Sequence, residues 1–138
     1  MRRSIGAALA YFLAIFTLAF GLGIIRTLFI ARVTGEWVAT LAELAILLPI
    51  AWFYSGWLTR RIGVPAEPID RLVMGVVAFS LLLIAELVLG RLLFERSPIE
   101  QLEQMLAGPG AIGLMGQVAF AIFPSFDVSR RTSLPTRT

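Results

Sequence analysis

Four long apolar segments constrain the fold of this chain more than any other feature of its sequence. They cover residues 5–30, 37–57, 72–94 and 106–126. About twenty apolar residues in a helix cross the roughly 30 Å hydrocarbon core of a bilayer. A helix also satisfies its own backbone hydrogen bonds, which water does not do inside lipid. We therefore expect an all-α integral membrane bundle of four transmembrane helices.

The composition supports this fold class. Hydrophobic residues make up 58% of the 138-residue chain and charged residues 15%, whereas soluble domains are roughly 45–50% apolar. We predict one transmembrane domain over residues 1–128. The Ser-, Thr- and Arg-rich residues 129–138 are expected to form a disordered cytoplasmic tail. The fourth segment gives the weakest signal, because Pro109 and Pro124 shorten its uninterrupted helix.

The distribution of arginine predicts the orientation in the membrane. One side receives the N-terminus, the loop between the second and third segments, and the tail. Its eight arginines are Arg2, Arg3, Arg60, Arg61, Arg71, Arg130, Arg131 and Arg137. The opposite side has four, which are Arg26, Arg32, Arg91 and Arg96. Because cytoplasmic loops carry the excess of positive charge, both termini are expected in the cytoplasm.

Two glutamates stand inside these apolar segments, Glu43 in "LAEL" and Glu86 in "IAEL". Glu43 follows Trp37, at the outer end of its segment, by six residues, which is about 9 Å of helix rise. Glu86 precedes Arg91 by five residues, or roughly 7–8 Å. Arg26 approaches the same surface at the end of the first segment. These four charged residues should therefore lie together in the outer half of the membrane.

Charges at this depth are expected to face the bundle interior and to pair. A lone charge near the bilayer centre costs about 2.5–3.5 kcal/mol on insertion scales. We predict that Arg26 contacts Glu43 or Glu86, since a guanidinium suits carboxylates geometrically. Arg91 either joins this cluster or extends to the lipid headgroups. Arg91 and Glu86 do not share a helix face. A glutamate that lacks an arginine is expected to be neutral.

Two interpretations of the cluster are open. One is an ion or proton pathway, or a polar ligand site, that opens to the outer side. The other is a structural clamp that fixes helix register. Pro49 should kink its helix one turn below Glu43, which either frees the Ala45 carbonyl to coordinate an ion or shapes packing. Gln117 is expected to join helices by hydrogen bonds, or else to contact a ligand.

The last outer loop carries signals for a short helix. Ser97, Pro98 and Glu100 fit the N-cap, N1 and N3 positions of a capping box. Gly108 supplies a stop signal. The helix is predicted to be amphipathic, and either lies on the membrane surface or packs on the bundle as a connector. Asp70 is expected to cap the third transmembrane helix. The apolar stripe of the short helix is Ile99, Leu102, Met105 and Leu106.

Cysteine and histidine are absent from the sequence. This excludes disulfides, thiolate or imidazole metal sites, and nucleophile systems that need cysteine or histidine. We therefore expect no catalytic residues, no metal, no cofactor and no enzymatic activity. The arginines flank apolar segments instead of forming a basic stripe, which argues against nucleic acid. The expected partners are the lipid bilayer and either further copies of the chain or other membrane proteins.

Several stretches resemble a group of small, uncharacterised four-helix bacterial inner-membrane proteins. They are "GIIRTLF", "RVTGEWVATLAELAILLPIAWF", "IAEL" and "AIGLMGQVAFAIFP". The resemblance covers most of the chain except the tail. It implies bacterial origin, a multi-pass location in the inner (plasma) membrane and four helices, and it transfers no activity. Our first hypothesis is a non-enzymatic accessory or assembly component with a buried Arg/Glu cluster. The alternative is a small oligomeric transporter or channel-like protein that uses protonatable Glu43 or Glu86.

Overall fold

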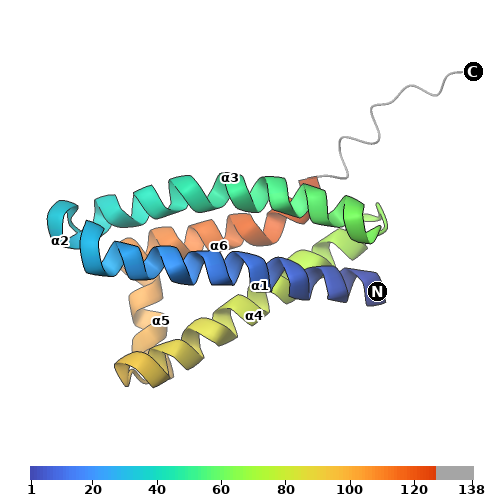
Figure 1. The fold of residues 1–138 in the computed structure, drawn as a ribbon. Coiled ribbons are helices and arrows are strands. Elements are labelled where there is room, and N and C mark those ends of the chain that lie inside the picture. Colours follow the sequence, from blue (N-terminus) through green and yellow to red (C-terminus); the bar gives the residue numbers. More distant parts are fainter. Residues whose placement is uncertain (127–138) are drawn as a thin grey trace, which may run out of the picture.

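The computed structural model describes residues 1–126, and over that range the chain is helical with no strand (Figure 1). The expected tail at residues 129–138 lies outside the described residues. The elements in chain order are α1 (Arg2–Ile25), the π-helical turn η1 (Arg26–Ile30), α2 (Ala31–Thr34), α3 (Glu36–Ile62), α4 (Pro68–Phe94), α5 (Pro98–Leu106) and α6 (Pro109–Phe126). The all-α fold class is therefore confirmed.

Four helices are long and apolar enough to cross a membrane, which confirms the prediction from hydropathy. These candidate spans are Arg2–Thr34, Glu36–Ile62, Pro68–Phe94 and Pro109–Phe126. The first three are longer than predicted, because helix continues into the flanking polar residues. The fourth begins at Pro109 and not at residue 106, because Gly108 adopts a φ of +56° that separates it from α5.

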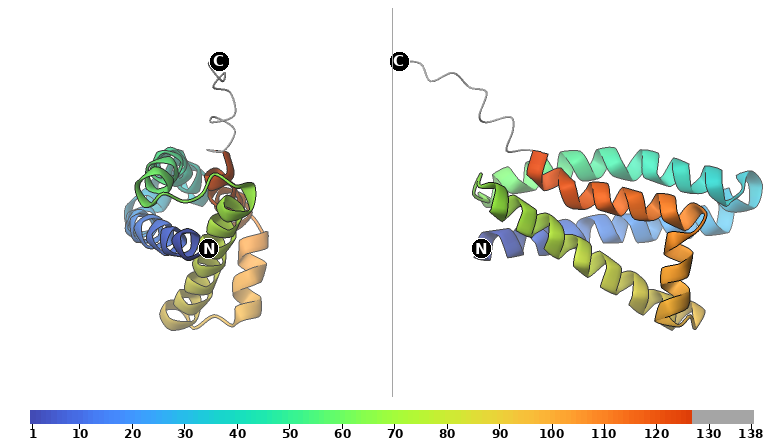
Figure 2. Two further views of the ribbon diagram at one scale, coloured as in Figure 1. Left: turned by 90° about the vertical axis from the view of Figure 1, so that its right-hand side faces the viewer. Right: turned by 180° about the vertical axis from the view of Figure 1, so that it is seen from behind.

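The long helices form an irregular bundle. Helices α1 and α3 lie side by side, and α6 packs against both α3 and α4 (Figure 1). Helix α4 contacts α1 but diverges from it toward the end of the bundle that carries α5. There α5 runs across the long helices and joins the end of α4 to the start of α6 (Figure 2). We call this the α5 end, and the opposite one the N-terminal end.

The tightly packed core lies toward the N-terminal end. Tyr11 is fully buried, and its ring stacks on Phe120 with centroids 4.2 Å apart. Its hydroxyl lies 3.2 Å from the Phe120 carbonyl and 3.4 Å from that of Ala51, so it bridges α6 and α3. Helices α4 and α6 approach so closely at Gly75 that a Cβ there would collide with the carbonyl of Ala121. Small residues thus let these helices meet backbone to backbone.

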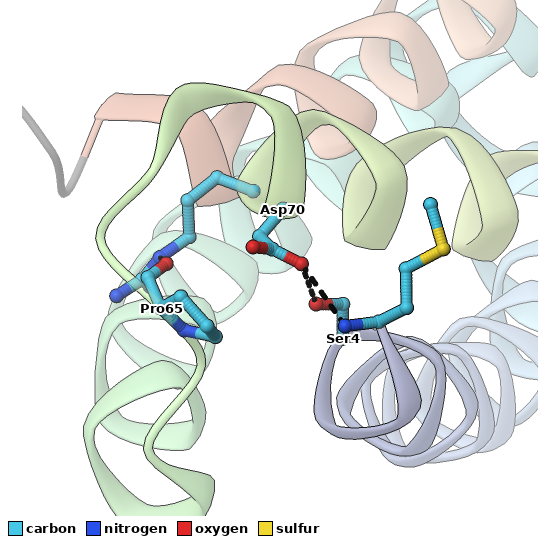
Figure 3. A network of polar contacts seen from close by, with 5 residues as sticks. Ser4, Pro65 and Asp70 are labelled. Atoms are coloured by element: carbon cyan, nitrogen blue, oxygen red, sulfur yellow. Dashed lines mark hydrogen bonds and ion pairs between the residues drawn. The ribbon is translucent and has the colours of Figure 1, made fainter.

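A polar network holds the N-terminal end together (Figure 3). The Ser4 hydroxyl donates to Asp70 at 2.7 Å, and the amino group of Met1 lies 3.3 Å from the same carboxylate. Arg71 is 1% exposed and donates to the carbonyls of Pro65 and Val64. These contacts fasten α1 and the α3–α4 loop to the start of α4.

The prediction that Asp70 caps the third long helix is wrong. Helix α4 begins at Pro68, and the residue in the N-cap position is Glu67, three positions before Asp70. Proline is favoured at N1 because its missing N–H has no partner there in any helix. This earlier start places Asp70 in the first turn, where its carboxylate is directed to α1 instead of to its own backbone.

The predicted capping box of α5 is confirmed. The backbone N–H of Glu100 donates to the Ser97 hydroxyl at 3.2 Å, and the N–H of Ser97 donates to the Glu100 carboxylate at 2.7 Å. The predicted apolar stripe of this helix is divided. Met105 is buried against the bundle, whereas Ile99, Leu102 and Leu106 are exposed. Helix α5 therefore packs on the bundle by one face and leaves another uncovered.

Candidate functional site

A cavity of about 750 Å³ lies at the α5 end, between the long helices and α5. This volume falls within the roughly 300–1,000 Å³ that is usual for small-molecule sites. Every described element except α2 contributes to its walls. Four of the six site residues predicted from the sequence contribute to the lining, which are Arg26, Glu43, Glu86 and Gln117.

The π-helical turn η1 positions the first of them. It begins at Arg26, and the N–H of Ala31 donates to the Arg26 carbonyl five residues back, the spacing of a π-helix. Such single turns inside α-helices occur frequently at functional sites. The Arg26 side chain is directed from this turn to α3. No signal in the sequence pattern indicated the turn.

Arg26 and Glu43 form an ion pair, with 3.0 Å between Nε and Oε2. Their side chains are 32% and 16% exposed, so water only partly screens the pair. Arg26 also donates from Nη1 to the Thr40 hydroxyl at 2.9 Å. Thr40 and Glu43 are three residues apart and therefore share one face of α3. Of the two contacts predicted for Arg26, the structure contains the one with Glu43.

Glu86 has a different partner. Its Oε1 accepts a hydrogen bond of 2.6 Å from the side-chain amide of Gln117, which joins α4 to α6. Within residues 1–126, no ion pair connects Glu86 to an arginine. The amide oxygen of Gln117 is buried and accepts no hydrogen bond from the described residues. Glu43 and Glu86 therefore differ: a cation neutralises Glu43, while a neutral amide holds Glu86.

Arg91 and Pro49 do not join the site. Arg91 is exposed and does not line the cavity. The five-residue offset from Glu86 places Arg91 on another face of α4. Helix α3 continues through Pro49, which is exposed. Neither Pro49 nor Ala45, whose carbonyl the proline leaves without its helical donor, lines the cavity.

Sequence reasoning missed the polar residues that α5 and the helix ends add to the wall. Arg96 donates to Gln101 at 3.4 Å, and both line the cavity beside Gln104. The spacing of Gln101 and Gln104 within the short helix was the available signal. Together with Glu36, these residues set the charge of the cavity. Three carboxylates and two arginines of residues 1–126 line it, which leaves one formal negative charge in excess.

The cavity ends toward the N-terminal end on apolar side chains. Ile15, Ala51, Leu82 and Phe120 are the lining residues nearest the N-terminal end of the bundle. Beneath them Tyr11 stacks on Phe120 within the buried core. In the part of the chain that the structure describes, the cavity therefore does not continue through the bundle.

The described residues contain no cluster of three or more acidic side chains that could hold a metal ion. The chemistry available at the site is that of one arginine–glutamate pair, one amide-bound glutamate, the further charges of Arg96 and Glu36, and several neutral donors and acceptors. Such groups bind and orient a polar or charged ligand. No protein-family model, no curated protein and no solved structure matches this chain.

Proposed function

We propose that this chain is a multi-pass protein of the bacterial inner membrane that binds a small organic cation in the cavity at its α5 end. Glu86 is the anionic anchor of the site. The observation that carries the proposal is the contrast between the two glutamates. Glu43 has Arg26 at 3.0 Å, whereas Glu86 is held by the neutral amide of Gln117 in a cavity with one carboxylate in excess.

A charge in a low-dielectric surrounding is costly, because it loses the solvation that water provides. A carboxylate between transmembrane helices is stable when a cation accompanies it or when it takes up a proton. Gln117 supplies a hydrogen bond to Glu86 but no charge. A proton and a cationic ligand therefore compete for Glu86, and a ligand with an ammonium group would complete the pairing that Arg26 already gives Glu43.

The closed floor of the cavity favours binding over an open channel. An ion-conducting path needs a polar route through the whole bundle. Here the apolar residues around Phe120 and the stacked Tyr11 block that route. Transport, the activity of the alternative hypothesis, would require these helices to separate so that the site opens to the other side. We therefore propose a binding protein whose site opens to one side.

Arginine placement supports an orientation with the α5 end outside. Among the described residues, five arginines flank the helices at the N-terminal end, namely Arg2, Arg3, Arg60, Arg61 and Arg71. At the α5 end there are four, namely Arg26, Arg32, Arg91 and Arg96, and two of them, Arg26 and Arg96, line the cavity. By the positive-inside rule the N-terminal end faces the cytoplasm. The ligand would then arrive from the outer side.

Helix α5 fits a position at the outer membrane interface. It runs across the long helices, and Ile99 and Leu106 on its uncovered face are 70% and 69% exposed. Leu92 and Leu93, at the end of α4, are also exposed and extend this apolar surface. An amphipathic helix with such a face lies in the plane of the headgroups. We propose this location for α5, which would place the cavity mouth near the aqueous boundary.

A non-enzymatic accessory or assembly role is the second candidate function. The observation that favours it is the Arg26–Glu43 ion pair, in which two side chains of the protein itself join η1 to α3. Such a pair fixes helix register whether or not the cavity is occupied. Under this reading Glu86 and Gln117 form a second, uncharged clamp between α4 and α6.

A binding experiment separates the two functions. The melting temperature of the purified protein in detergent is measured with increasing butylammonium chloride, with sodium chloride keeping the ionic strength constant. A ligand that binds only the folded state raises this temperature by mass action. We expect a concentration-dependent rise in the wild type and none in Glu86→Gln, which retains an amide beside Gln117. Glu103→Gln, an exposed change outside the cavity, is the matched control and should behave as the wild type.

The outcomes discriminate clearly. An equal rise in the wild type and Glu86→Gln would remove Glu86 as the anchor. No rise in the wild type at any concentration would refute cation binding and favour the accessory function.

A further inference from the structure

The lining of the cavity changes from polar to apolar with depth. Near α5 the walls carry Arg26, Glu43, Glu86, Gln101 and Gln117. Deeper in the bundle there are only apolar side chains, among them Ile15, Ala19, Leu47, Leu48, Leu82 and Phe120. A small hydrated ion would make no favourable contact with these apolar walls. A ligand with one polar end and one apolar end would contact the polar walls with the first and the apolar walls with the second.

Helix geometry sets the length of the apolar half. On α3, Leu47 and Ala51 follow Glu43 by four and eight residues, which corresponds to about 6 and 12 Å of rise. On α4, Leu82 precedes Glu86 by four residues, again about 6 Å. Both helices therefore provide one to two turns of apolar wall on the floor side of the carboxylates. This depth accommodates a short hydrocarbon chain.

The volume supports the same conclusion. At about 30 Å³ of liquid volume for each water molecule, 750 Å³ corresponds to roughly 25 waters. A metal ion or ammonium would fill a small part of this space and would leave water against the apolar walls. Water in contact with apolar walls is unfavourable relative to a hydrocarbon group in the same place. The space is thus better filled by an organic substituent than by solvent.

On the premise that the proposed cation site exists, we infer that its ligand is an amphiphilic amine. The ammonium group lies in the cavity against the carboxylate of Glu86, which the side-chain amide of Gln117 holds by a hydrogen bond of 2.6 Å. An alkyl or similar apolar substituent extends from it toward Phe120. Arg26 and Glu43 neutralise each other beside the ammonium group and add no net charge.

The test compares primary alkylammonium ions of increasing length, from methylammonium to hexylammonium, by titration calorimetry on the detergent-solubilised protein. Each buried methylene should tighten binding about fourfold. Ala19→Leu places a larger side chain in the apolar half and should abolish the gain from longer chains. Ala14→Leu is an equal change at an exposed position of the same helix and should leave the whole series unaltered.

Alkylammonium ions also partition into detergent, so the decisive quantity is the difference between Ala19→Leu and Ala14→Leu at each chain length. A difference that grows with length supports the amphiphile. If both variants keep the same chain-length dependence, the apolar half is not used and the inference is wrong. Neutral 1-hexanol should bind at least tenfold more weakly than hexylammonium, and equal binding would contradict the charged end.

A different result would refute the proposed cation site on which the inference rests. If Glu86→Gln binds every member of the series as tightly as the wild type does, the cation site itself is absent. If Glu86→Gln loses binding but the affinity is independent of chain length, the cation site stands and only the amphiphilic ligand is refuted.

Discussion

Gln117 of α6 donates its side-chain amide to Glu86 of α4 at 2.6 Å, at the same cavity where Arg26 and Glu43 join η1 to α3 at 3.0 Å. Two polar contacts thus connect two pairs of helices, and only one of them carries a positive charge.

Arg26 should couple energetically with Glu43 and not with Glu86. We expect a double-mutant cycle of Arg26→Gln and Glu43→Gln to give a coupling energy of about 0.5–3 kcal/mol, the range for residues in one ion pair. The partial exposure of Arg26 favours the lower part of that range. Thermal unfolding in detergent measures it. The same cycle with Glu86→Gln is the control, and a coupling equal to that of Glu43 would contradict the assignment.

Replacing Gln117 by leucine should destabilise the protein by about 1–3 kcal/mol, the cost of leaving a half-buried polar group without its partner. The affected group is Glu86, which loses the hydrogen bond from the amide. Chemical denaturation in detergent measures the change. Gln104→Leu removes an amide from the exposed part of the cavity wall and should change stability by less than half as much. If Gln117→Leu and Gln104→Leu lower the stability equally, the hydrogen bond between Gln117 and Glu86 does not contribute to stability as expected.

Gly75→Ala should be destabilising because the added Cβ meets the carbonyl oxygen of Ala121, which is backbone and has little freedom to move. Overpacking of this kind costs about 1–3 kcal/mol. At Gly113, also inside a long helix, an added Cβ would meet nothing within 4 Å. Gly113→Ala should therefore be neutral, or stabilising by up to about 1 kcal/mol through its helix propensity. Melting temperatures compare the pair. Reversed signs would contradict the close approach of α4 and α6.

Butylammonium binding should weaken as pH falls, because a proton and the ammonium group compete for Glu86. Once the pH is low enough for Glu86 to be mostly protonated, each further decrease of one pH unit should lower the affinity for butylammonium about tenfold. Calorimetric titrations between pH 4 and 8 measure this dependence. Substitution of Glu103 should not alter the profile, since that residue is exposed and outside the cavity. A pH-independent affinity in the wild type would contradict the role of Glu86 as the anchor.

The parts of the fold that hydropathy and local chemistry control could be predicted. The four long helices follow from segment length and apolar content. The capping box at Ser97 and Glu100 depends only on residues three positions apart. The common depth of Arg26 and Glu43 follows from helix rise, and the structure brings these two side chains together.

The rest depends on helix rotation and on tertiary contacts. Depth does not fix which way a side chain points, so Arg91 remained a candidate although it is exposed. The pairing of Glu86 with Gln117 was not predicted. The two residues are 31 positions apart and lie on different helices, so only the tertiary packing of α4 against α6 brings them together. Asp70 has the residue type of a helix cap, but a contact with Ser4 of another helix determines its role. The π-helical turn at Arg26 has no sequence signature in this chain.

Helix α5 connects the end of α4 to the start of α6, and it holds these two helix ends at a fixed distance from each other. Its nine residues span about 13 Å, and the chain on either side of it is too short to take up slack. The number of helical turns in α5 therefore largely determines the width of the cavity mouth. A longer α5 should therefore hold the ends of α4 and α6 farther apart and widen the mouth of the cavity.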